Sequence, residues 1–526
     1  FHAGIDFRTG GKVGKRVYAS ESGYVSRIKV SGTGFGKALY INHPNGTTTV
    51  YAHLNGFAQQ IAAYVKEYQY KKEQFEVNIH LAPGTFKIKK GEFIGYTGNT
   101  GSSGGPHLHY EVRRTSSQTP INPSFSTLPI IDTLPPVIYS LWGYPADSSS
   151  YINEENIKKE IIGKVNGLDK NINDTIRAYG TIGLGIETYD FINRGSLRCG
   201  VYSIKMLVNT NLIYHYLVDQ FSYNEIRYAN SHLDYGLTQL SGKRIHKLYK
   251  EPNNRFSGYK IIKNNGFIKV KKDSIYNVTI TVHDAHKNTS KINLTIVGTN
   301  KPNVVNGPVR QKNNVKKEKW LFYKENTLIT EDFKISIPKN SLYKNIEFTY
   351  DTISKLSNKL SPIIRLHNNL TPLHRDYNLA IKVDSLPTHL RDKALIATFS
   401  LDGDLKAVGG KYSNGYVSAT TNSFGDFIVE VDTVPPVITP LNIVNKKRMT
   451  NEKSIRFTVD DNLSGVKSIE GTINNQWALF KHDPKNNLVF YEFDKERLEK
   501  RQEHTLTLKV NDNKDNLSEY RCTFIW

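Results

Sequence analysis

Three short segments near the start of the sequence constrain the fold most strongly, because they carry side chains that act together only if the chain brings them together. The segments are Phe1-His2-Ala3-Gly4-Ile5-Asp6-Phe7, Tyr51-Ala52-His53-Leu54 and Pro106-His107-Leu108-His109-Tyr110. They contribute four histidines and one carboxylate within the first 110 residues. Imidazole nitrogens and a carboxylate oxygen form a usual ligand set for zinc, and two imidazoles remain for other roles.

The spacing of these residues predicts their local geometry. His107 and His109 are two residues apart in an alternating run that is typical of a strand, so both side chains point to the same face. His2 and Asp6 are four residues apart, which is roughly 13 Å in a straight strand. Both would need to lie about 2.0–2.2 Å from one ion. The chain must therefore bend between them, and Gly4 is the residue that permits a bend.

His53 ends a second alternating run, which predicts that Thr47, Thr49, Tyr51 and His53 share one face of a strand. A lone His-x-His pair is a weak indicator of a metal site, since tags, turns and core histidines produce it often. The three motifs in this order are a much stronger indicator.

The set resembles the lysostaphin/LytM-type zinc metallopeptidases, whose signatures are His-x-x-x-Asp, Tyr-x-His-Leu and His-x-His. The flanking segments match as well, and they are Ile41-Asn42-His43-Pro44-Asn45-Gly46, Gly98-Asn99-Thr100-Gly101 and Gly105-Pro106-His107-Leu108-His109-Tyr110-Glu111-Val112-Arg113. The resemblance covers residues 1 to about 125, roughly a quarter of the chain.

Carried over position by position, the resemblance makes His2, Asp6 and His109 the ligands of one Zn²⁺ ion per chain. It makes His53 and His107 the catalytic pair that does not bind the ion. Three protein ligands leave a fourth position for water, which marks a catalytic rather than a structural site. The family's substrate class implies hydrolysis of the peptide cross-links of bacterial peptidoglycan, with stem peptides as the partner.

The family fold is an antiparallel sheet, and this chain adds one helix to it. Phe57, Ile61, Tyr64, Val65 and Tyr68 recur at the spacing of one helical face. Two interpretations stay open: the helix packs on the sheet, or it forms a wall or lid beside the cleft.

A repeat links two distant parts of the chain. Its opening, Asp-Thr-x-Pro-Pro-Val-Ile, stands at Asp132–Ile138 and at Asp432–Ile438. Three further blocks match, namely Thr188-Tyr189-Asp190 with Thr458-Val459-Asp460, Gly200–Ile204 with Gly465–Ile469, and Val282–Ser290 with Val510–Ser518. Short strands with Asp, Asn and Gly turns favour immunoglobulin-like β-sandwich modules.

The sequence thus predicts a mainly β, multidomain protein. The predicted domains are a peptidase domain over 1–127, a long β module over 128–300, a β domain of unknown role over 301–431 and a short β module over 432–526. The proline-punctuated linker between 120 and 136 predicts few contacts across it.

One possible second metal pair, His283-x-x-His286, loses support from the repeat. The other copy has Asn511 and Lys514 at these positions. We therefore interpret the segment as a turn.

Composition limits the partners. The net charge of +21 indicates either attraction to anionic envelope polymers or a solvated surface, and we leave both open. The basic residues are scattered and match no nucleic-acid motif, so we expect no nucleic-acid partner. The chain has no run of about 18 apolar residues, so we expect no membrane span.

The sequence begins inside the first histidine segment and shows no signal peptide. We therefore expect it to be a fragment of an exported protein, located in the periplasm or at the envelope or surface of a bacterium. The leading hypothesis is a zinc metalloendopeptidase. The alternatives are a non-hydrolytic envelope-binding or regulatory protein that uses the peptidase fold, and an adhesin whose β modules are the functional part.

Overall fold

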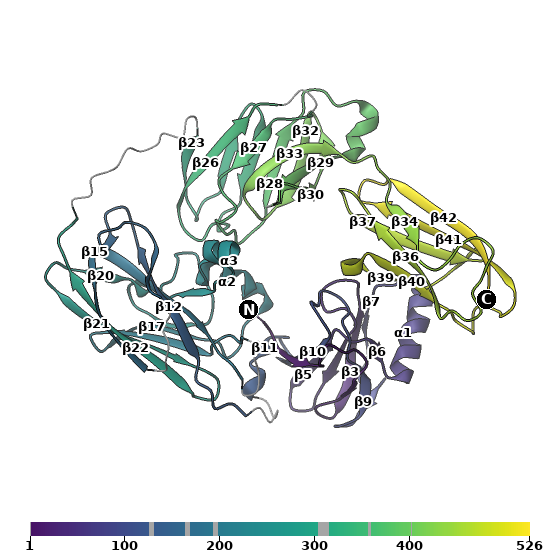
Figure 1. Cartoon of the computed structure of the whole chain (residues 1–526), viewed down its shortest axis with the longest axis horizontal. Helices are drawn as coiled ribbons and strands as arrows, with labels where there is room; N and C mark the ends of the chain where they lie inside the picture. The colour runs from purple at the N-terminus through teal and green to yellow at the C-terminus, as the bar shows by residue number, and fades with distance from the viewer. Residues whose placement is uncertain are drawn as a thin grey trace.

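A computed structural model of the chain describes residues 2–125, 131–163, 169–192, 198–302, 315–355, 359–400 and 402–526. Phe1 of the first histidine segment and residues 126–130 of the predicted linker lie outside the described residues. The protein is mainly β and multidomain, as predicted, and its parts follow one another round a closed circuit (Figure 1).

The N-terminal part is built on one antiparallel sheet. In spatial order its strands are β1 (Ile5–Arg8), β10 (His107–Arg114), β5 (Thr47–Ala52), β4 (Ala38–Asn42), β3 (Gly23–Val30) and β7 (Val77–His80), with β11 (Pro120–Ile121) on β10 and β8 (Lys87–Ile88) on β3. A small second sheet consists of β2 (Arg16–Tyr18), β9 (Phe93–Tyr96) and β6 (Gly56–Phe57), and a 3₁₀ turn, η1 (Pro123–Phe125), follows.

The alternation of β10 divides its side chains between two environments. Tyr110 and Val112 are buried in the main core of this part. The histidines, which alternate with them, face the opposite side, where Phe35 stacks on His109. One face of the strand therefore stabilises the fold while the other carries the candidate site.

The predicted helix is confirmed as α1 (Gln59–Lys72), except that Phe57, the first residue of the predicted face, lies in β6 before it. Ile61 and Val65 are buried in the core, as the periodicity requires, while Tyr64 remains exposed beside Phe86. The helix therefore packs on the sheet, which is the first of the two interpretations. It ends at Glu73, whose left-handed conformation caps the last turn.

The next part, residues 131–302, forms a single extended sheet network. Its path is β14 (Lys159–Ile162), β12 (Val137–Pro145), β15 (Asp169–Tyr189), β22 (Thr289–Gly298), β21 (Ile275–His283), β16 (Ser203–Val208), β17 (Asn211–Leu217) and β19 (Tyr259–Ile262), and β13 (Tyr151–Ile152), β18 (Ile245–Lys247) and β20 (Ile268–Val270) also pair with β15. Its helical elements are η2 (Tyr223–Tyr228), α2 (Ala229–His232), α3 (Tyr235–Ser241) and η3 (Asn264–Gly266).

The middle part contains two sheets over a common core. The first holds β23 (Lys316–Trp320), β26 (Ile346–Ile353), β27 (Ile363–Leu366), β33 (Gly425–Val431), β29 (Ala394–Phe399) and β30 (Leu405–Gly409). The second holds β24 (Asn326–Ile329), β25 (Phe333–Ile337), β28 (Tyr377–Lys382), β32 (Tyr416–Thr421) and β31 (Lys411–Ser413), and η4 (Thr388–Lys393) precedes β29.

The C-terminal part is also a pair of sheets with its own core. One contains β34 (Val437–Pro440), β36 (Ser454–Asp460), β40 (Leu488–Glu492) and β39 (Phe480–Asp483). The other contains β35 (Lys447–Arg448), β42 (Leu517–Ile525), β41 (Glu503–Asp512), β37 (Val466–Ile473) and β38 (Gln476–Trp477), and η5 (Pro484–Asn486) joins β39 to β40. Each of the four parts thus has its own large hydrophobic core, while the domain boundaries and the immunoglobulin-like assignment stay predictions.

The repeated residues fasten the entering segment of each module. In the first copy, the side chain of Asn288 donates to the carbonyl of Asp132, and Ser290 donates to the carbonyl of Pro136. The second copy has the same pair of bonds, from Asn516 to Asp432 and from Ser518 to Pro436. The Asn and Ser residues of this repeated block therefore have the same role in both copies, which is to hold the backbone of the entering segment.

The predicted match of Thr188-Tyr189-Asp190 with Thr458-Val459-Asp460 is shifted by one residue. In the first copy Val137 pairs with Tyr189, whereas in the second Val437 pairs with Asp460. Asp190 is therefore the structural equivalent of Asp461 and not of Asp460. Sequence similarity alone missed the shift because Thr-x-Asp occurs in both copies.

The predicted turn at His283–His286 is confirmed. Asp284 Oδ1 accepts hydrogen bonds from the backbone N–H groups of His286 and Asn288, and His283 Nδ1 contacts Thr289 Oγ1 at 2.9 Å. The two histidines therefore do not form a metal pair.

The expectation of few contacts across the linker is wrong. The backbone N–H of Asn122 donates to Asp219, and Arg114 Nε donates to Gln220 at 2.9 Å. Tyr223 reaches back into the N-terminal part, as described below. Proline residues restrict the linker itself, but they carry no information about which surfaces pack beside it.

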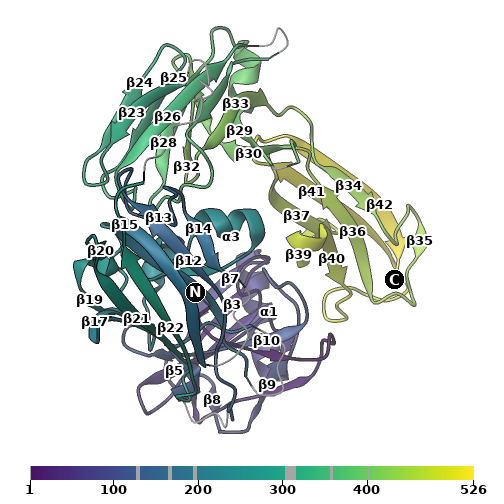
Figure 2. The same cartoon turned by 60° about the vertical axis from the view of Figure 1, so that its left-hand side comes forward.

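The C-terminal part closes the circuit by contacting α1 (Figures 1 and 2). Lys66 Nζ lies 2.7 Å from Asp494, and Arg497 lies 2.9 Å from Glu67. The guanidinium of Arg497 also stacks over the ring of Tyr70 at 3.6 Å. The contact is therefore polar and aromatic, which is typical of interfaces between domains of one chain.

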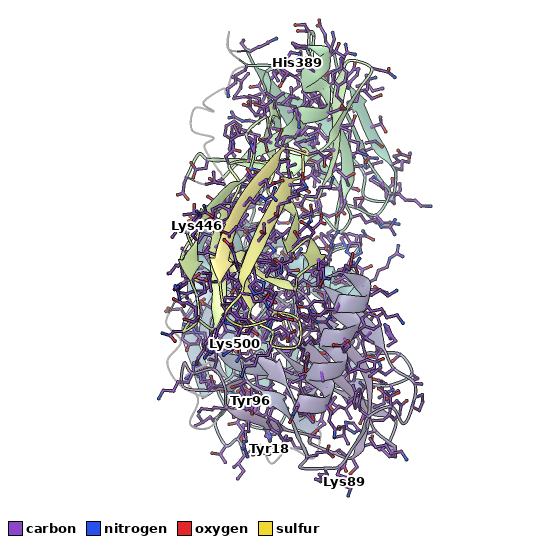
Figure 3. The ribbon with its side chains drawn as sticks, turned by 90° about the vertical axis from the view of Figure 1, so that its right-hand side faces the viewer. Tyr18, Lys89, Tyr96, His389, Lys446 and Lys500 are labelled. Carbon is purple, nitrogen blue, oxygen red and sulfur yellow. The ribbon has the colours of Figure 1, made fainter. Side chains whose placement is uncertain are left out.

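Basic side chains extend from the surface of several parts. Lys89 of the N-terminal part and Lys446 and Lys500 of the C-terminal part are exposed (Figure 3). In the part of the chain that the structure describes, every helix is too short or too polar to cross a membrane.

Replacing Arg497 with alanine tests the closure of the circuit. Exposed ion pairs contribute about 0.2–1 kcal/mol and exposed cation–π contacts about 0.5–1 kcal/mol, so we expect the contact to weaken by about 1 kcal/mol. Small-angle X-ray scattering should then report a larger radius of gyration. Arg521→Ala, on the exposed side of β42, is the matched control. Identical scattering from the two variants would contradict a role for Arg497.

Candidate active site

The pairing of β1 with β10 brings the first and third histidine segments together. Asp6 lies directly opposite His109, and Arg8 lies opposite His107. The predicted bend before β1 is present at Gly4, and it places His2 Nε2 3.2 Å from Asp6 Oδ1. A Cβ atom at Gly4 would lie 2.2 Å from the carbonyl oxygen of Tyr110, so the position excludes any side chain.

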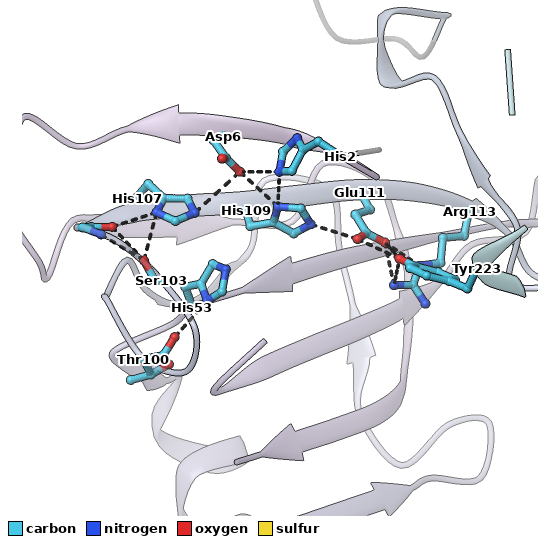
Figure 4. A network of polar contacts seen from close by, with 11 residues as sticks. His2, Asp6, His53, Thr100, Ser103, His107, His109, Glu111, Arg113 and Tyr223 are labelled. Carbon is cyan, nitrogen blue, oxygen red and sulfur yellow. Dashed lines mark hydrogen bonds and ion pairs between the residues drawn. The ribbon is translucent and has the colours of Figure 1, made fainter. Parts of the chain in front are cut away.

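Three possible metal-ligand atoms, one each from His2, Asp6 and His109, form a nearly equilateral triangle (Figure 4). His2 Nε2 and His109 Nδ1 are 3.1 Å apart, His109 Nδ1 and Asp6 Oδ1 are 3.0 Å apart, and His2 Nε2 and Asp6 Oδ1 are 3.2 Å apart. Zinc–ligand bonds of about 2.0–2.1 Å in a tetrahedron give ligand–ligand distances of about 3.3 Å. The triangle therefore fits three ligands of one zinc ion, with the remaining position directed away from the protein donors.

A buried carboxylate fixes the orientation of His109. His109 Nε2 lies 2.8 Å from Glu111 Oε1, and Glu111 is fully buried. Because an ionised carboxylate only accepts, Nε2 keeps its hydrogen, so Nδ1 is the nitrogen that would present a lone pair to a metal. Burial lowers the pKa of His109, but the carboxylates of Asp6 and Glu111 raise it to about 9 without a metal. Metal binding at Nδ1 would therefore release a proton.

Glu111 is held by a set of donors from two parts of the chain. Arg113 Nε donates at 2.6 Å, and the hydroxyl of Tyr223 donates at 2.9 Å (Figure 4). Tyr223 belongs to η2 of the following module. Burial raises the pKa of Glu111, but the hydrogen bond from His109 and the charge of Arg113 hold it below its usual range. The carboxylate is therefore ionised and orients His109.

Asp6 is a second stabilised carboxylate of the site. Burial raises its pKa, whereas hydrogen bonds from His109 and His2 lower it far below its ordinary value. Asp6 is thus ionised at every physiological pH and available as a ligand.

His53 reaches the site by a route that the sequence did not predict. Along β5, Tyr51 faces the core opposite Tyr110, so alternation would turn His53 toward that core. Instead, β5 ends at Ala52 and His53 adopts a left-handed φ of 58°. Its ring then lies 4.8 Å from the ring of His107. The predicted shared face is therefore wrong at its last residue, and such strain is common at functional sites.

Backbone carbonyls set the tautomers of His53 and His107. His53 Nδ1 lies 2.8 Å from the carbonyl of Thr100, and His107 Nδ1 lies 2.8 Å from the carbonyl of Gly105. A carbonyl only accepts, so each Nδ1 carries the hydrogen and each Nε2 has a lone pair that can accept a proton. His107 Nε2 lies 3.6 Å from Asp6 Oδ1. Burial lowers the pKa of His53 to about 4. His53 is therefore neutral at neutral pH.

The structure brings all five predicted site residues together, with His53 and His107 beside the triangle rather than in it. Sequence reasoning assigned no role to Glu111, Arg113 or Tyr223. The period-2 pattern from His109 to Glu111 and Arg113 could have indicated the first two, since all three share one strand face. Tyr223 has no sequence signal, because it depends on how two domains pack.

Comparisons with known proteins match the part of the chain that carries these residues. The profile described as Peptidase family M23 matches residues 1–70 and 77–123, and the profile of a Zu5-like domain matches residues 318–432. The DD-carboxypeptidase/endopeptidase Mpg of Neisseria meningitidis serogroup B is 37% identical over 128 residues, which are 24% of this chain and 23% of that protein. An uncharacterized metalloprotease of Haemophilus influenzae is 34% identical over 110 residues, which are 21% of this chain and 18% of that protein.

Among solved structures, the catalytic domain of the M23 protein EnpA of Enterococcus faecalis is 26% identical, with a TM-score of 0.18, and the match covers 24% of this chain and 79% of that one. The chain spans less than a quarter of the length of the curated relatives named above. The N-terminal part is a peptidase family M23 domain of the LytM/lysostaphin type, and the resemblance predicted from the histidine segments is confirmed.

The contact between Tyr223 and Glu111 can be tested through metal affinity. Removing a hydrogen-bond partner behind a metal ligand typically weakens metal binding about 10–100-fold. We expect Glu111→Gln to lie in that range and Tyr223→Phe to lie near its lower end, because Arg113 remains. Zinc competition against a chromophoric chelator measures both. Tyr276→Phe, whose hydroxyl bonds Lys269 elsewhere in the same module, is the control and should bind zinc normally.

Proposed function

We propose that this protein is an exported zinc-dependent metalloendopeptidase that hydrolyses the peptide cross-links of bacterial peptidoglycan. The observation that carries the proposal is the triangle of His2, Asp6 and His109 with two further imidazoles beside it. The M23 match of the same residues supports the substrate class. The periplasm or cell envelope follows as the location, because the proposed substrate is there.

The proposed mechanism divides the work between ligands and imidazoles. A zinc ion bound by His2, Asp6 and His109 would supply Lewis-acid activation of a water molecule and of the scissile carbonyl. The Nε2 atom of one neighbouring imidazole accepts a proton as the water oxygen attacks the amide carbon. As the carbon–nitrogen bond breaks, a protonated imidazole returns a proton to the departing amine. His53 and His107 are both suited to these steps, and we leave their division open.

The proposed bond is a direct cross-link between stem peptides rather than a glycine bridge. The name of the Neisseria relative, a DD-carboxypeptidase/endopeptidase, favours this choice. Lysostaphin, the namesake of the family resemblance, also matches in structure, but at 24% identity and a TM-score of 0.17 that likeness carries no argument about the bond.

Two non-enzymatic functions compete with this proposal. The first is a binding or regulatory protein that uses the peptidase fold without hydrolysis, and the second is an adhesin based on the β modules. The complete set of five site residues favours hydrolysis over the first. Release of peptides from purified sacculi, measured by mass spectrometry together with zinc content, separates the proposals and identifies the bond.

The division of roles predicts two kinds of variant. Alanine at His2, Asp6 or His109 should give protein that is both metal-poor and inactive, since each removes one of three ligands. Alanine at His53 or His107 should leave zinc near one per chain and lower the rate about 10²–10⁴-fold, because a general acid or base is lost. Metal analysis of the purified variants, paired with the rate of cross-link hydrolysis, gives both readouts.

The pair His107 and His109 is the sharpest contrast, because the two lie on one strand face and differ only in the atoms they meet. Zinc loss in His107→Ala together with zinc retention in His109→Ala would reverse the assignment. Unchanged zinc content in both would place the ion elsewhere.

The charge of the chain gives a separate prediction about attachment. If the net charge of +21 attracts anionic envelope polymers, binding to sacculi should fall steeply between 50 and 300 mM salt. Over that range the Debye length falls from above about 10 Å to below about 8 Å. A sedimentation assay of the zinc-loaded protein measures the bound fraction. If the bound fraction does not change with salt, attachment depends on specific contacts rather than on the net charge.

A further inference from the structure

A short 3₁₀ helix of the first β module connects the candidate site to the middle part of the chain. This helix, η2 (Tyr223–Tyr228), continues into α2, which lies between the sheet of the module and the middle part (Figure 1). Its first residue, Tyr223, donates to Glu111 at the site. Its last two residues, Arg227 and Tyr228, contact the middle part. One helix therefore contacts both neighbours of the module.

The middle part anchors the C-terminal end of η2. The guanidinium of Arg227 donates to Asp376 Oδ1 at 2.8 Å and to the carbonyl of His374 at 3.1 Å. The backbone carbonyl of Arg227 accepts from the hydroxyl of Tyr343. The ring of Tyr228 stacks on the ring of His374, with centroids 4.2 Å apart and planes inclined by 13°. The middle part thus holds this end of η2 through the backbone as well as through side chains.

A buried asparagine fixes the loop that supports η2. Asn253 is 2% exposed, and its side-chain amide donates to two carbonyls of residues 340–342 of the middle part, at 2.9 and 2.8 Å. Its backbone N–H donates to the carbonyl of Tyr343 at 2.9 Å. The next residue, Asn254, donates from its side chain to the carbonyl of Tyr228 at 3.1 Å. The loop therefore joins η2 to the middle part a second time.

The same interface contains a buried ion pair. Glu251 is 7% exposed, and its Oε1 atom lies 3.0 Å from Lys247 Nζ of the same module and 3.3 Å from Lys344 Nζ of the middle part. Burial raises the pKa of Glu251, but the charges of the two lysines hold it below its usual range. Removing one partner of such a buried pair is strongly destabilising. The middle part is therefore firmly packed on the surface that carries η2.

The segment before η2 is fixed to the M23 domain. Gln220 forms an isolated β-bridge with Ile121 of that domain. Ser222 and Glu225 then form a capping box at the first turn of the helix. A 3₁₀ helix rises about 2.0 Å per residue, so the two ends of η2 lie about 10 Å apart. The two anchored ends are thus joined by one short, capped helix.

The contact at the site is sensitive to small displacements of this helix. The hydroxyl of Tyr223 lies 2.9 Å from each carboxylate oxygen of Glu111. A hydrogen bond is lost when its heavy atoms are about 3.6 Å apart, so a shift of η2 by less than about 1 Å breaks the contact. Glu111 would then keep Arg113 but lose a donor, and it would orient His109 less well. The position of η2 therefore bears on metal affinity.

We propose that the middle part positions Tyr223 through η2 and thereby raises the affinity of the candidate site for zinc. The inference rests on the proposed function, because it requires the triangle of ligand atoms to bind the ion. Tyr223 and Arg227 are positioning residues, since they act through Glu111 and His109. Linkage requires the reverse effect as well, so that zinc binding strengthens the docking of the middle part by the same factor. The site would thus reach its full affinity only in a chain whose middle part is docked.

A double-mutant cycle on the full chain tests this proposal. Arg227→Ala combined with Tyr343→Phe removes the side-chain contacts at the end of η2. It should weaken zinc binding by at least about threefold, and by no more than the roughly tenfold loss expected for Tyr223→Phe. In a chain that already carries Tyr223→Phe, the same two changes should have no further effect, because the hydroxyl that they position is absent. Competition against a chromophoric chelator measures all four affinities.

Arg365→Ala is the matched control. It breaks an exposed ion pair with Asp426 elsewhere in the middle part, so its zinc affinity should equal that of the parent chain. Unchanged affinity in the variant of Arg227 and Tyr343, or an equal loss with and without the hydroxyl of Tyr223, would overturn the inference alone. A parent chain that binds no zinc would overturn the proposed function and, with it, this inference.

Hydrogen exchange gives a readout that does not depend on a folded interface variant and that a purely structural interface would not change. The amide of Asn253 donates across the interface, so its exchange rate reports docking. Zinc should slow this exchange in the parent chain by at least about threefold, as linkage requires. Tyr223→Phe should abolish the slowing. Equal exchange with and without zinc, followed by mass spectrometry of the peptide that contains Asn253, would contradict the coupling.

Discussion

The buried carboxylate of Glu111 is the interaction on which the site depends. A fully buried charge is tolerated only when donors replace the water that it has lost. Here the donors are His109 from the same strand, Arg113 two residues further on, and Tyr223 from the next module. The orientation of His109 is thus determined by a charge that Tyr223 of the first β module helps to stabilise. The M23 domain and its neighbour therefore form one structural unit around this carboxylate.

The C-terminal module contacts the other side of the site. Residues 98–105 supply the carbonyls that orient the imidazoles of His53 and His107, and Lys485 of η5 donates to two further carbonyls of this loop, those of Asn99 and Ser103. An ammonium group has three donors and suits such a cluster of carbonyl oxygens. Residues of two other modules thus hold the candidate site: Tyr223 contacts Glu111, and Lys485 contacts the loop that orients His53 and His107.

The two copies of the β module show how one framework can carry different charges. The hydrogen bonds that hold the entering segment are the same in both copies, because they use backbone carbonyls and short polar side chains. One residue within the shared turn differs, with His286 in one copy and Lys514 in the other. A turn tolerates such exchange, since its own bonds come from the backbone and from Asp284 or Asp512. The side chain at this position can therefore change between the copies without loss of the bonds that form the turn.

The sequence by itself determined the elements whose causes are local. The alternation around His109, the helical face at Ile61 and Val65, and the bend at Gly4 follow from the geometry of a few neighbouring residues. The left-handed turn at His53, the one-residue shift of Asp190 and the donation from Tyr223 to Glu111 did not. Each of these depends on which strands pair or which surfaces pack, and such long-range choices leave no period in the sequence. The sequence thus determined which side chains are candidate ligands, and the tertiary structure decided what holds them in place.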